Sequence, residues 1–162
     1  MNQENKNAQE TGNPQFAVIT QFLKDLSFEC PRGSVGVDEK AMSMNVNVGI
    51  STSVVAEDVY EVVLKIAGDA KVNEETVFIA DVSYAGHFIM RNIPEEQKDM
   101  LISIEAPNLL FPFARRILMS AIVDAGFRSP QIEPINFAHL YMQAKQQKGQ
   151  APEEQKKIEK KD

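Results

Sequence analysis

The sequence predicts an α+β fold, in which a four-stranded, mainly antiparallel sheet is followed by helices that pack on one of its faces. In the first half of the chain, apolar and polar residues alternate, as they do in strands with one buried face. Beyond residue 94, apolar residues recur at helical spacing instead. Because the strands come first and the helices afterwards, the two kinds of element form an α+β rather than an α/β arrangement.

The chain has 162 residues, which is the size of one domain with tails. Residues 1–14 are polar, rich in amide side chains and without periodicity, so we expect a disordered N-terminal arm there. Residues 145–162 are charged and polar, and we expect them to form a flexible C-terminal tail. A single domain is then expected to span residues 15–144.

Four segments have the alternation of a strand, and in the first of them Phe16, Phe22 and Phe28 are expected to share one face. Residues 30–41 contain Pro, Gly and Ser and are expected to form a loop after this strand. The second segment has a methionine-bearing apolar face, and methionine adapts to varied surfaces. The strands are expected at residues 16–29, 42–51, 59–72 and 76–90, with a short polar turn joining the last two.

A central helix is expected at residues 107–126, with the sequence PNLLFPFARRILMSAIVDAG. Asn108 is a suitable N-cap, and Gly126 stands where a helix end favours a residue with positive φ. Apolar residues cover most of the circumference, so the helix is buried on most of it. One apolar face comprises Leu110, Phe113, Ala114, Ile117 and Ala121, and a second comprises Leu118, Met119, Ile122 and Val123.

A chain of this size can cover one of these helix faces with its own sheet. The second face requires another copy of the chain or a client, so the pattern favours an oligomer over a monomer with a central core helix. A shorter helix is expected to open at Pro94 and to end before Pro107, because a residue that precedes proline resists the α conformation. Asn136 is expected to cap a last helix, in which Phe137, Leu140, Tyr141 and Ala144 share a face.

The composition narrows the class of partner and the compartment. The net charge of −6 and the pI of about 5.0 argue against nucleic acid and anionic membranes and favour a basic partner. The chain has a single cysteine, Cys30, and no signal peptide or membrane-spanning apolar run is apparent, so we expect no membrane insertion. A cytoplasmic protein is the simplest expectation.

The sequence contains no recognisable catalytic or metal-binding constellation. Neither a phosphate loop of the GxxxxGK[ST] kind nor a GxGxxG motif occurs, so work on another protein would proceed without nucleotide hydrolysis. His87, His139 and Cys30 are the only candidates for a nucleophile and base, and no local context supports such a pair. Ligand pairs at the short spacing of a zinc site are missing. We therefore expect no enzyme activity, no cofactor and no metal.

Five segments together resemble the SecB family of protein-export chaperones. They are KDLSFE (24–29), EDVYEVVL (57–64), EETVFIADV (74–82), PNLLFPFAR (107–115) and EPINFAHLYM (133–142), and they occur in order across residues 16–142. The resemblance implies a homotetramer built as a dimer of dimers, with the sheets outside and the long helices between them. It also implies an ATP-independent holdase that keeps precursor proteins unfolded and passes them to SecA, the motor ATPase of secretion.

The resemblance also implies roles for residues at matching positions. The SecA-docking positions of the family match Asp25, Glu29, Ile79 and Asp81. The client-binding positions match Met44, Val46, Val48, Phe137 and Tyr141. Assembly positions on the fourth strand match Ala80, Val82 and Tyr84, and the second face of the central helix adds Leu118 and Ile122 to the expected oligomer interface.

The chain departs from the family pattern in two places. The loop at residues 31–40 lacks the aromatic residue that some relatives carry, and Ser43, Asn45 and Asn47 replace alternating charges on the second strand. Both departures concern the client groove. Two other functions stay open beside the export chaperone: a SecB-like chaperone for other clients, such as a toxin–antitoxin pair, and an oligomeric α+β protein that binds a small ligand or has weak enzyme activity.

Overall fold

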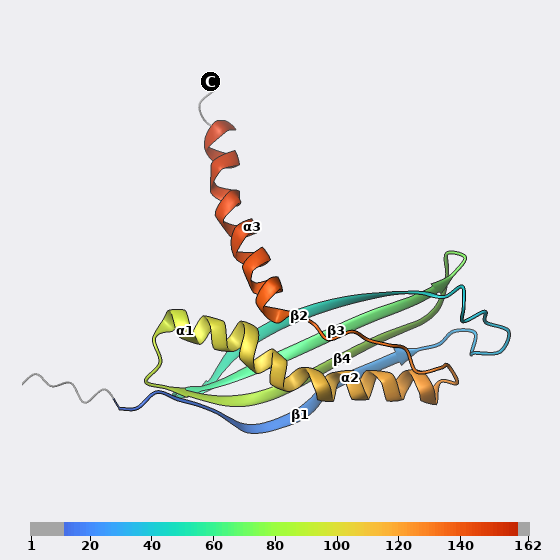
Figure 1. Cartoon of the computed structure of the whole chain (residues 1–162), viewed down its shortest axis with the longest axis horizontal. Coiled ribbons are helices and arrows are strands. Elements are labelled where there is room, and N and C mark those ends of the chain that lie inside the picture. Colours follow the sequence, from blue (N-terminus) through green and yellow to red (C-terminus); the bar gives the residue numbers. More distant parts are fainter. Residues whose placement is uncertain (1–11, 159–162) are drawn as a thin grey trace, which may run out of the picture.

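The computed structural model describes residues 12–158, with side chains described up to residue 147, and shows a sheet with helices α1 and α2 along one face and α3 projecting away from it (Figure 1). The expected N-terminal arm lies almost wholly outside the described residues. The elements are β1 Gln15–Glu29, β2 Ser43–Ala56, β3 Val59–Val72, β4 Glu75–Arg91, α1 Glu95–Met100, the π-helical turn η1 Leu101–Glu105, α2 Ala106–Asp124 and α3 Phe137–Ile158. The predicted α+β fold with a four-stranded antiparallel sheet is confirmed.

The four strands pair in the order β1-β4-β3-β2, and every pair is antiparallel. A tight turn joins β3 to β4, where Asn73 and Glu74 have φ of 49° and 67°. Two successive residues with positive φ are typical of a hairpin turn whose twist matches that of its strands. The first two strands of the chain, β1 and β2, therefore form the two edges of the sheet, and β4 and β3 lie between them.

Strand β1 carries two register shifts, one between Val18 and Thr20 and one between Leu23 and Asp25. Each β-bulge adds a residue and so reverses which positions face the helices. The prediction that Phe22 shares a face with Phe16 and Phe28 is therefore wrong. Phe22 pairs with Ala85 and packs edge-on against His87 at 5.3 Å, on the face of the sheet that the helices leave open.

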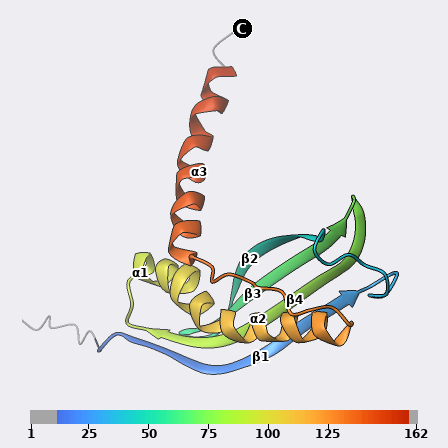
Figure 2. The ribbon, with the colours of Figure 1, turned by 45° about the vertical axis from the view of Figure 1, so that its right-hand side comes forward.

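Elements α1, η1 and α2 follow one another as a bent helix along one face of the sheet (Figure 2). The predicted break before Pro107 is wrong, because the backbone stays helical through Leu101 and Ala106. The N–H of Ala106 donates to the carbonyl of Leu101, which is the wider bonding pattern of a π-helical turn. Pro107 lacks an N–H and lies just after this π-helical turn, where the regular i→i−4 bonding is already interrupted. Asn108 lies inside α2 and caps nothing.

The core lies between α2 and the two central strands. Leu110, Ala114, Leu118 and Ile122 recur every fourth residue along α2 and are fully buried. They pack against the inner faces of β3 and β4, where the buried residues include Val62, Leu64, Ile66, Phe78, Ala80, Val82 and Phe88. The predicted assignment of Leu118 and Ile122 to a second apolar face is therefore wrong, because both share the sheet-facing side of α2 with Leu110.

The end of α2 and the start of α3 follow their sequence signals. Gly126 has φ of 90°, and the N–H of Phe127 donates to the carbonyl of Ile122, as in a glycine-terminated helix. Asn136 caps α3, since the N–H of His139 donates to its Oδ1 at 2.9 Å. Helix α3 points away from the sheet and extends beyond residue 145, where the sequence predicts a flexible tail (Figure 1). Within residues 12–158, no helix has the length and apolar character to cross a membrane.

Candidate functional site

An apolar groove of about 620 Å³ runs along the edge strand β2. One wall is formed by residues 44 and 46–48 of β2, and the opposite wall is formed by the connection between α2 and α3 together with Leu140 of α3. Pro130 and Pro134 fall within this connection, and proline favours an extended chain over a helix. The apolar lining consists of Met44, Val46, Val48, Pro130, Ile132, Ile135 and Leu140. We call it the client groove, after the predicted client-binding residues Met44, Val46 and Val48 that it contains.

The register of β2 explains why the groove is on the helix side of the sheet. Met44 pairs with Ala70 and Val48 pairs with Ile66, and both partners are fully buried beneath the helices. Paired residues in antiparallel strands point to the same face, so the apolar positions of β2 face inward. The groove remains open there because β2 is an edge strand and α2 contacts β3 and β4 instead.

The structure brings only part of the predicted client-binding set to this groove. Phe137 is 1% exposed and packs edge-on against Phe111, so it belongs to the core. Tyr141 points elsewhere, because its hydroxyl donates to Asp99 Oδ2 at 2.7 Å and its ring lies beneath Lys145. Leu140, which is 41% exposed, lines the groove in their place. The sequence predicts that Leu140 lies on the apolar face of the last helix, but it does not indicate that β2 lies opposite Leu140 across the groove.

The predicted docking residues come together on the opposite, outer face of the sheet. Glu29 pairs with Ile79 and Ser27 pairs with Asp81, so β1 and β4 are direct neighbours at this point. Asp25 lies two positions before Ser27 on β1 and pairs with Ser83. Ile79 is 41% exposed and provides an apolar spot among the carboxylates. We call Asp25, Glu29, Ile79 and Asp81 the acidic patch.

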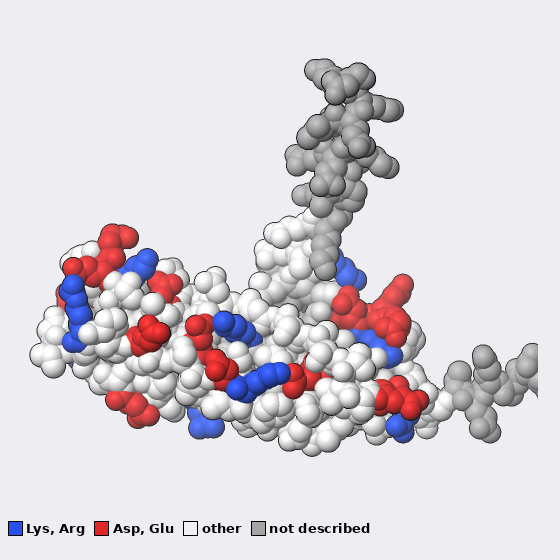
Figure 3. All heavy atoms as spheres, turned by 180° about the vertical axis from the view of Figure 1, so that it is seen from behind, with Lys and Arg blue, Asp and Glu red and all other residues white. Residues whose placement is uncertain are grey.

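The outer face also carries cations, interspersed with the carboxylates (Figure 3). Lys65 Nζ lies 3.6 Å from Asp81 Oδ1 and partly neutralises it. Neither Asp25 nor Glu29 has an ion-pair partner among the side chains described for residues 12–147, and both are exposed. These two carboxylates therefore face solvent with their charge uncompensated.

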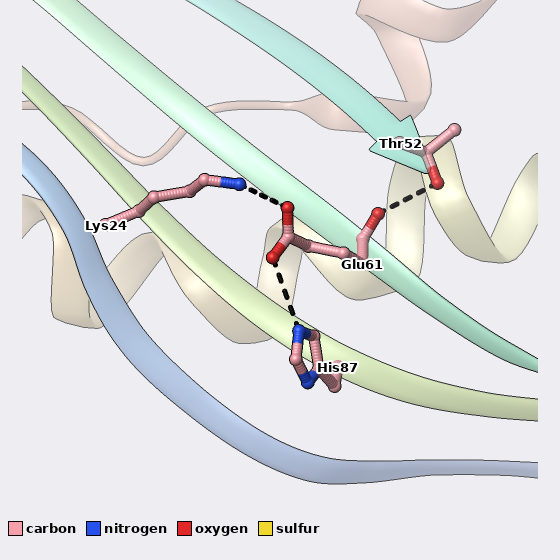
Figure 4. A network of polar contacts seen from close by, with 4 residues as sticks. All are labelled: Lys24, Thr52, Glu61 and His87. Atoms are coloured by element: carbon pink, nitrogen blue, oxygen red, sulfur yellow. Dashed lines mark hydrogen bonds and ion pairs between the residues drawn. The ribbon is translucent and has the colours of Figure 1, made fainter. Parts of the chain in front are cut away.

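A polar network spans the outer face beside this patch (Figure 4). Lys24 of β1 reaches across β4 and donates to Glu61 Oε1 on β3, while His87 Nε2 of β4 lies 3.3 Å from Glu61 Oε2. The hydrogen bond from Lys24 lowers the pKa of Glu61 below its ordinary value of 4.5, and the contact with His87 acts in the same direction against the opposing effect of burial. On β2, the Thr52 hydroxyl donates to the Glu61 carbonyl at 3.0 Å.

The predicted interface residues Ala80, Val82, Tyr84, Leu118 and Ile122 are all buried between the sheet and α2 of one chain. They cannot contact another copy directly in this arrangement. The exposed apolar residues lie beside them: Leu109, Phe113 and Val123 on α2, and Leu23 and Leu26 on the edge strand β1, each between 42% and 46% exposed. Phe113 stacks on Tyr84 at 5.7 Å and links the exposed set to the buried one.

Within the described part of the chain, no three His, Cys, Asp or Glu side chains gather as they would around a metal ion. The surfaces that the structure presents are an apolar groove and a charged patch, which are features of binding sites.

The comparison with known proteins agrees with this arrangement. The family model described as preprotein translocase subunit SecB matches residues 9–148. The chain belongs to the SecB family. Protein-export protein SecB of Parvibaculum lavamentivorans is 41% identical over 145 residues, covering 88% of this chain and 86% of the relative. The SecB of Zymomonas mobilis is 42% identical over 142 residues, covering 87% of each chain.

A solved structure shares the SecB-type fold at much lower sequence identity. It is a SecB-like chaperone of Mycobacterium tuberculosis in complex with a ChAD peptide from an antitoxin. The TM-score is 0.64 at 11% identity, over 74% of this chain and 90% of that one. This likeness concerns the fold alone.

Proposed function

We propose that this SecB-family chain is an ATP-independent holdase, which binds unfolded precursor proteins and passes them to SecA for export. The observation that carries the proposal is the pairing of an apolar groove on the inner side of the sheet with an acidic patch on its outer side. A chaperone that hands a client to a motor needs one surface for each partner. Membership of the SecB family indicates the class of partner, and the two separate surfaces support one binding site for each.

The client groove suits an unfolded chain. Burying an apolar side chain against Met44, Val46 or Leu140 contributes about 1.5–3 kcal/mol, without requiring one partner shape. Strand β2 is also a sheet edge, and an edge strand offers unpaired N–H and C=O groups to an extended peptide. A client segment would thus gain backbone hydrogen bonds from β2 and apolar contacts from the groove. Phe137 would act from the core, by holding α3 in place.

The acidic patch suits a basic docking segment of SecA. Asp25 and Glu29 supply uncompensated negative charge, and Ile79 supplies a small apolar contact between them and Asp81. Opposite charge across an interface raises the association rate and fixes the orientation of the partners. The patch lies on the face opposite to the groove, so a client and SecA would not compete for the same residues.

Assembly as a homotetramer, a dimer of dimers, is part of the proposal. The exposed apolar residues Leu109, Phe113 and Val123 of α2 would each gain burial from a second copy, and the edge of β1 offers a further apolar surface. The buried residues Ala80, Val82, Tyr84, Leu118 and Ile122 would support this interface from beneath. Sedimentation of the chain at micromolar concentration should give the mass of a tetramer, and a stable monomer would contradict it.

Two other functions predict different bound species. The M. tuberculosis relative by fold is bound to an antitoxin peptide, so a chaperone with clients other than exported proteins is the second candidate. It would hold unfolded chains but would not bind SecA. A small-ligand protein would retain a defined small molecule in the groove when purified.

The direct test is a refolding assay without nucleotide. A slow-folding precursor is diluted from denaturant with and without the chain, and the rate at which it regains structure is measured. We expect the chain to slow refolding at near-stoichiometric amounts, with no further effect of ATP. An unchanged refolding rate, or an absolute need for ATP, would overturn the holdase proposal.

A further inference from the structure

The β-bulge at Leu23–Asp25 places a lysine directly beside the acidic patch. In a regular strand, adjacent residues point to opposite faces, so Lys24 and Asp25 would be separated by the sheet. The bulge leaves Lys24 without a partner on β4, and its side chain lies on the outer face, where Asp25 pairs with Ser83. A cation and an anion that are neighbours in sequence thus share one face.

Lys24 nevertheless does not neutralise Asp25. Its ammonium group reaches over β4 and binds Glu61 on β3, two strands away (Figure 4). The Glu61 side chain is only 14% exposed, whereas Asp25 is exposed to solvent. A charge pair with less water around it attracts more strongly, because the effective dielectric constant is lower. His87 contacts the other oxygen of Glu61 and holds the carboxylate in position.

We propose that Glu61 is a positioning residue for the acidic patch, which binds Lys24 and thereby keeps Asp25 free for the basic partner. This inference rests on the proposed docking of SecA at the patch and deepens it. Removing the carboxylate of Glu61 releases Lys24, whose nearest remaining carboxylate along the chain is Asp25. The patch then loses one negative charge at the position where the partner docks.

The first experiment measures the affinity of purified SecA for four forms of the full chain: the parent, Glu61→Gln, Lys24→Met, and both changes together. We expect Glu61→Gln to weaken binding about fivefold at low ionic strength, the scale of a well-placed surface charge, and less at high salt. The double variant should bind SecA as the parent does, because the released lysine is gone. Sedimentation should show the same assembly mass for all four.

A matched control is available at the far end of the same face. Asp58 binds Arg91 with 3.0 Å between Oδ2 and Nε, so Asp58→Asn also removes one carboxylate and releases one cation. Asp58 has φ of 56°, a conformation that asparagine also tolerates. The net charge changes as in Glu61→Gln, but Arg91 is ten positions along β4 from Asp81, or about 34 Å. We expect SecA affinity to stay within about twofold of the parent, because about 34 Å exceeds the Debye length, which is about 10 Å at 0.1 M salt and about 30 Å at 0.01 M.

Two results would overturn the positioning role. One is that Glu61→Gln binds SecA like the parent, and the other is that the double variant binds as weakly as Glu61→Gln alone.

The second experiment needs no SecA, so it separates this inference from the docking proposal. Lys24 is labelled with a mild amine-acylating reagent and quantified by mass spectrometry. We expect Asp25→Asn to label as the parent does, and Glu61→Gln with Asp25→Asn to label several-fold faster. If Asp25→Asn alone raises labelling to that level, Asp25 already holds Lys24 and the inference is wrong.

A parent chain that fails to bind SecA while showing the expected labelling would contradict the docking proposal and support the release of Lys24 by loss of Glu61.

Discussion

The client groove and the acidic patch lie on opposite faces of one sheet, and they differ in how the chain builds them. The patch is made by two paired strands, so its residues are placed by register alone. The groove joins an edge strand to a connection more than 80 residues further along the chain, so it exists only once the helices have packed. The patch relies on charge in water and the groove on apolar contact. Conditions and substitutions should therefore affect the two surfaces separately.

The largest effect is expected at the core residue that supports the groove. Phe137→Ala should lower the free energy of unfolding by about 3–5 kcal/mol, because Phe137 is buried against Phe111. The neighbouring groove residue provides the contrast: Leu140→Ala should cost little stability, since Leu140 is 41% exposed, yet should weaken client binding. Denaturant unfolding and client titration of both variants check this. Equal stability losses would contradict the placement of Phe137 in the core.

The next largest effect is expected on client binding, from substitutions within the groove itself. Introducing carboxylates by Val46→Asp and Leu140→Asp together should weaken binding of an unfolded precursor about 30- to 100-fold, since an apolar client segment would have to desolvate both charges. Calorimetry with a permanently unfolded precursor measures it. SecA affinity should stay within about twofold of the parent, because both residues lie on the inner face. Loss of both activities together would argue that the two surfaces are coupled.

A smaller and salt-dependent effect is expected at the patch. Glu29→Lys and Asp81→Lys should each weaken SecA binding about tenfold at low ionic strength, with much of the difference lost when salt shortens the Debye length. Client holding and the assembly mass should not change. Surface plasmon resonance at two salt concentrations provides the measurement. Parent-like SecA binding by both variants at low salt would remove the acidic patch from the docking surface.

The smallest effect concerns pH and the Glu61 network. The pKa of Glu61 is lowered in the folded chain, chiefly by Lys24, so its ion pair stabilises the fold above the ordinary pKa of 4.5. That contribution is lost as pH falls below 4.5 and through the lowered pKa. Unfolding midpoints should show the parent losing more stability than Glu61→Gln as the pH falls through this window. Parallel curves for the two forms would contradict the assigned ion pair.

The two surfaces also differ in how far sequence alone could predict them. The pattern of strands and helices gave the fold, and the acidic patch needed only the added knowledge that β1 and β4 pair. The bulges in β1 could not be seen, because a single added residue looks like ordinary alternation until its partner strand is known. They move Phe22 to the outer face and bring Lys24 beside Asp25.

The groove and the buried side of α2 could not be predicted from sequence because both depend on how the helices pack against the sheet. Apolar residues surround α2, and only the position of the sheet decides which of them are buried. Leu118 and Ile122 therefore looked like an outward face and are core residues. Phe137 shares a helical face with Leu140 in sequence, but Phe137 packs against Phe111 in the core, whereas Leu140 lines the groove and is 41% exposed.

The separation of the two surfaces is tested most directly by measuring SecA affinity for the chain already saturated with an unfolded precursor that lacks its own affinity for SecA. We expect a ternary complex in sedimentation and a SecA dissociation constant within about twofold of that of the empty chain, because groove and patch lie on opposite faces of the sheet. Displacement of the precursor by SecA in a simple competitive titration would contradict the assignment of the two partners to separate faces.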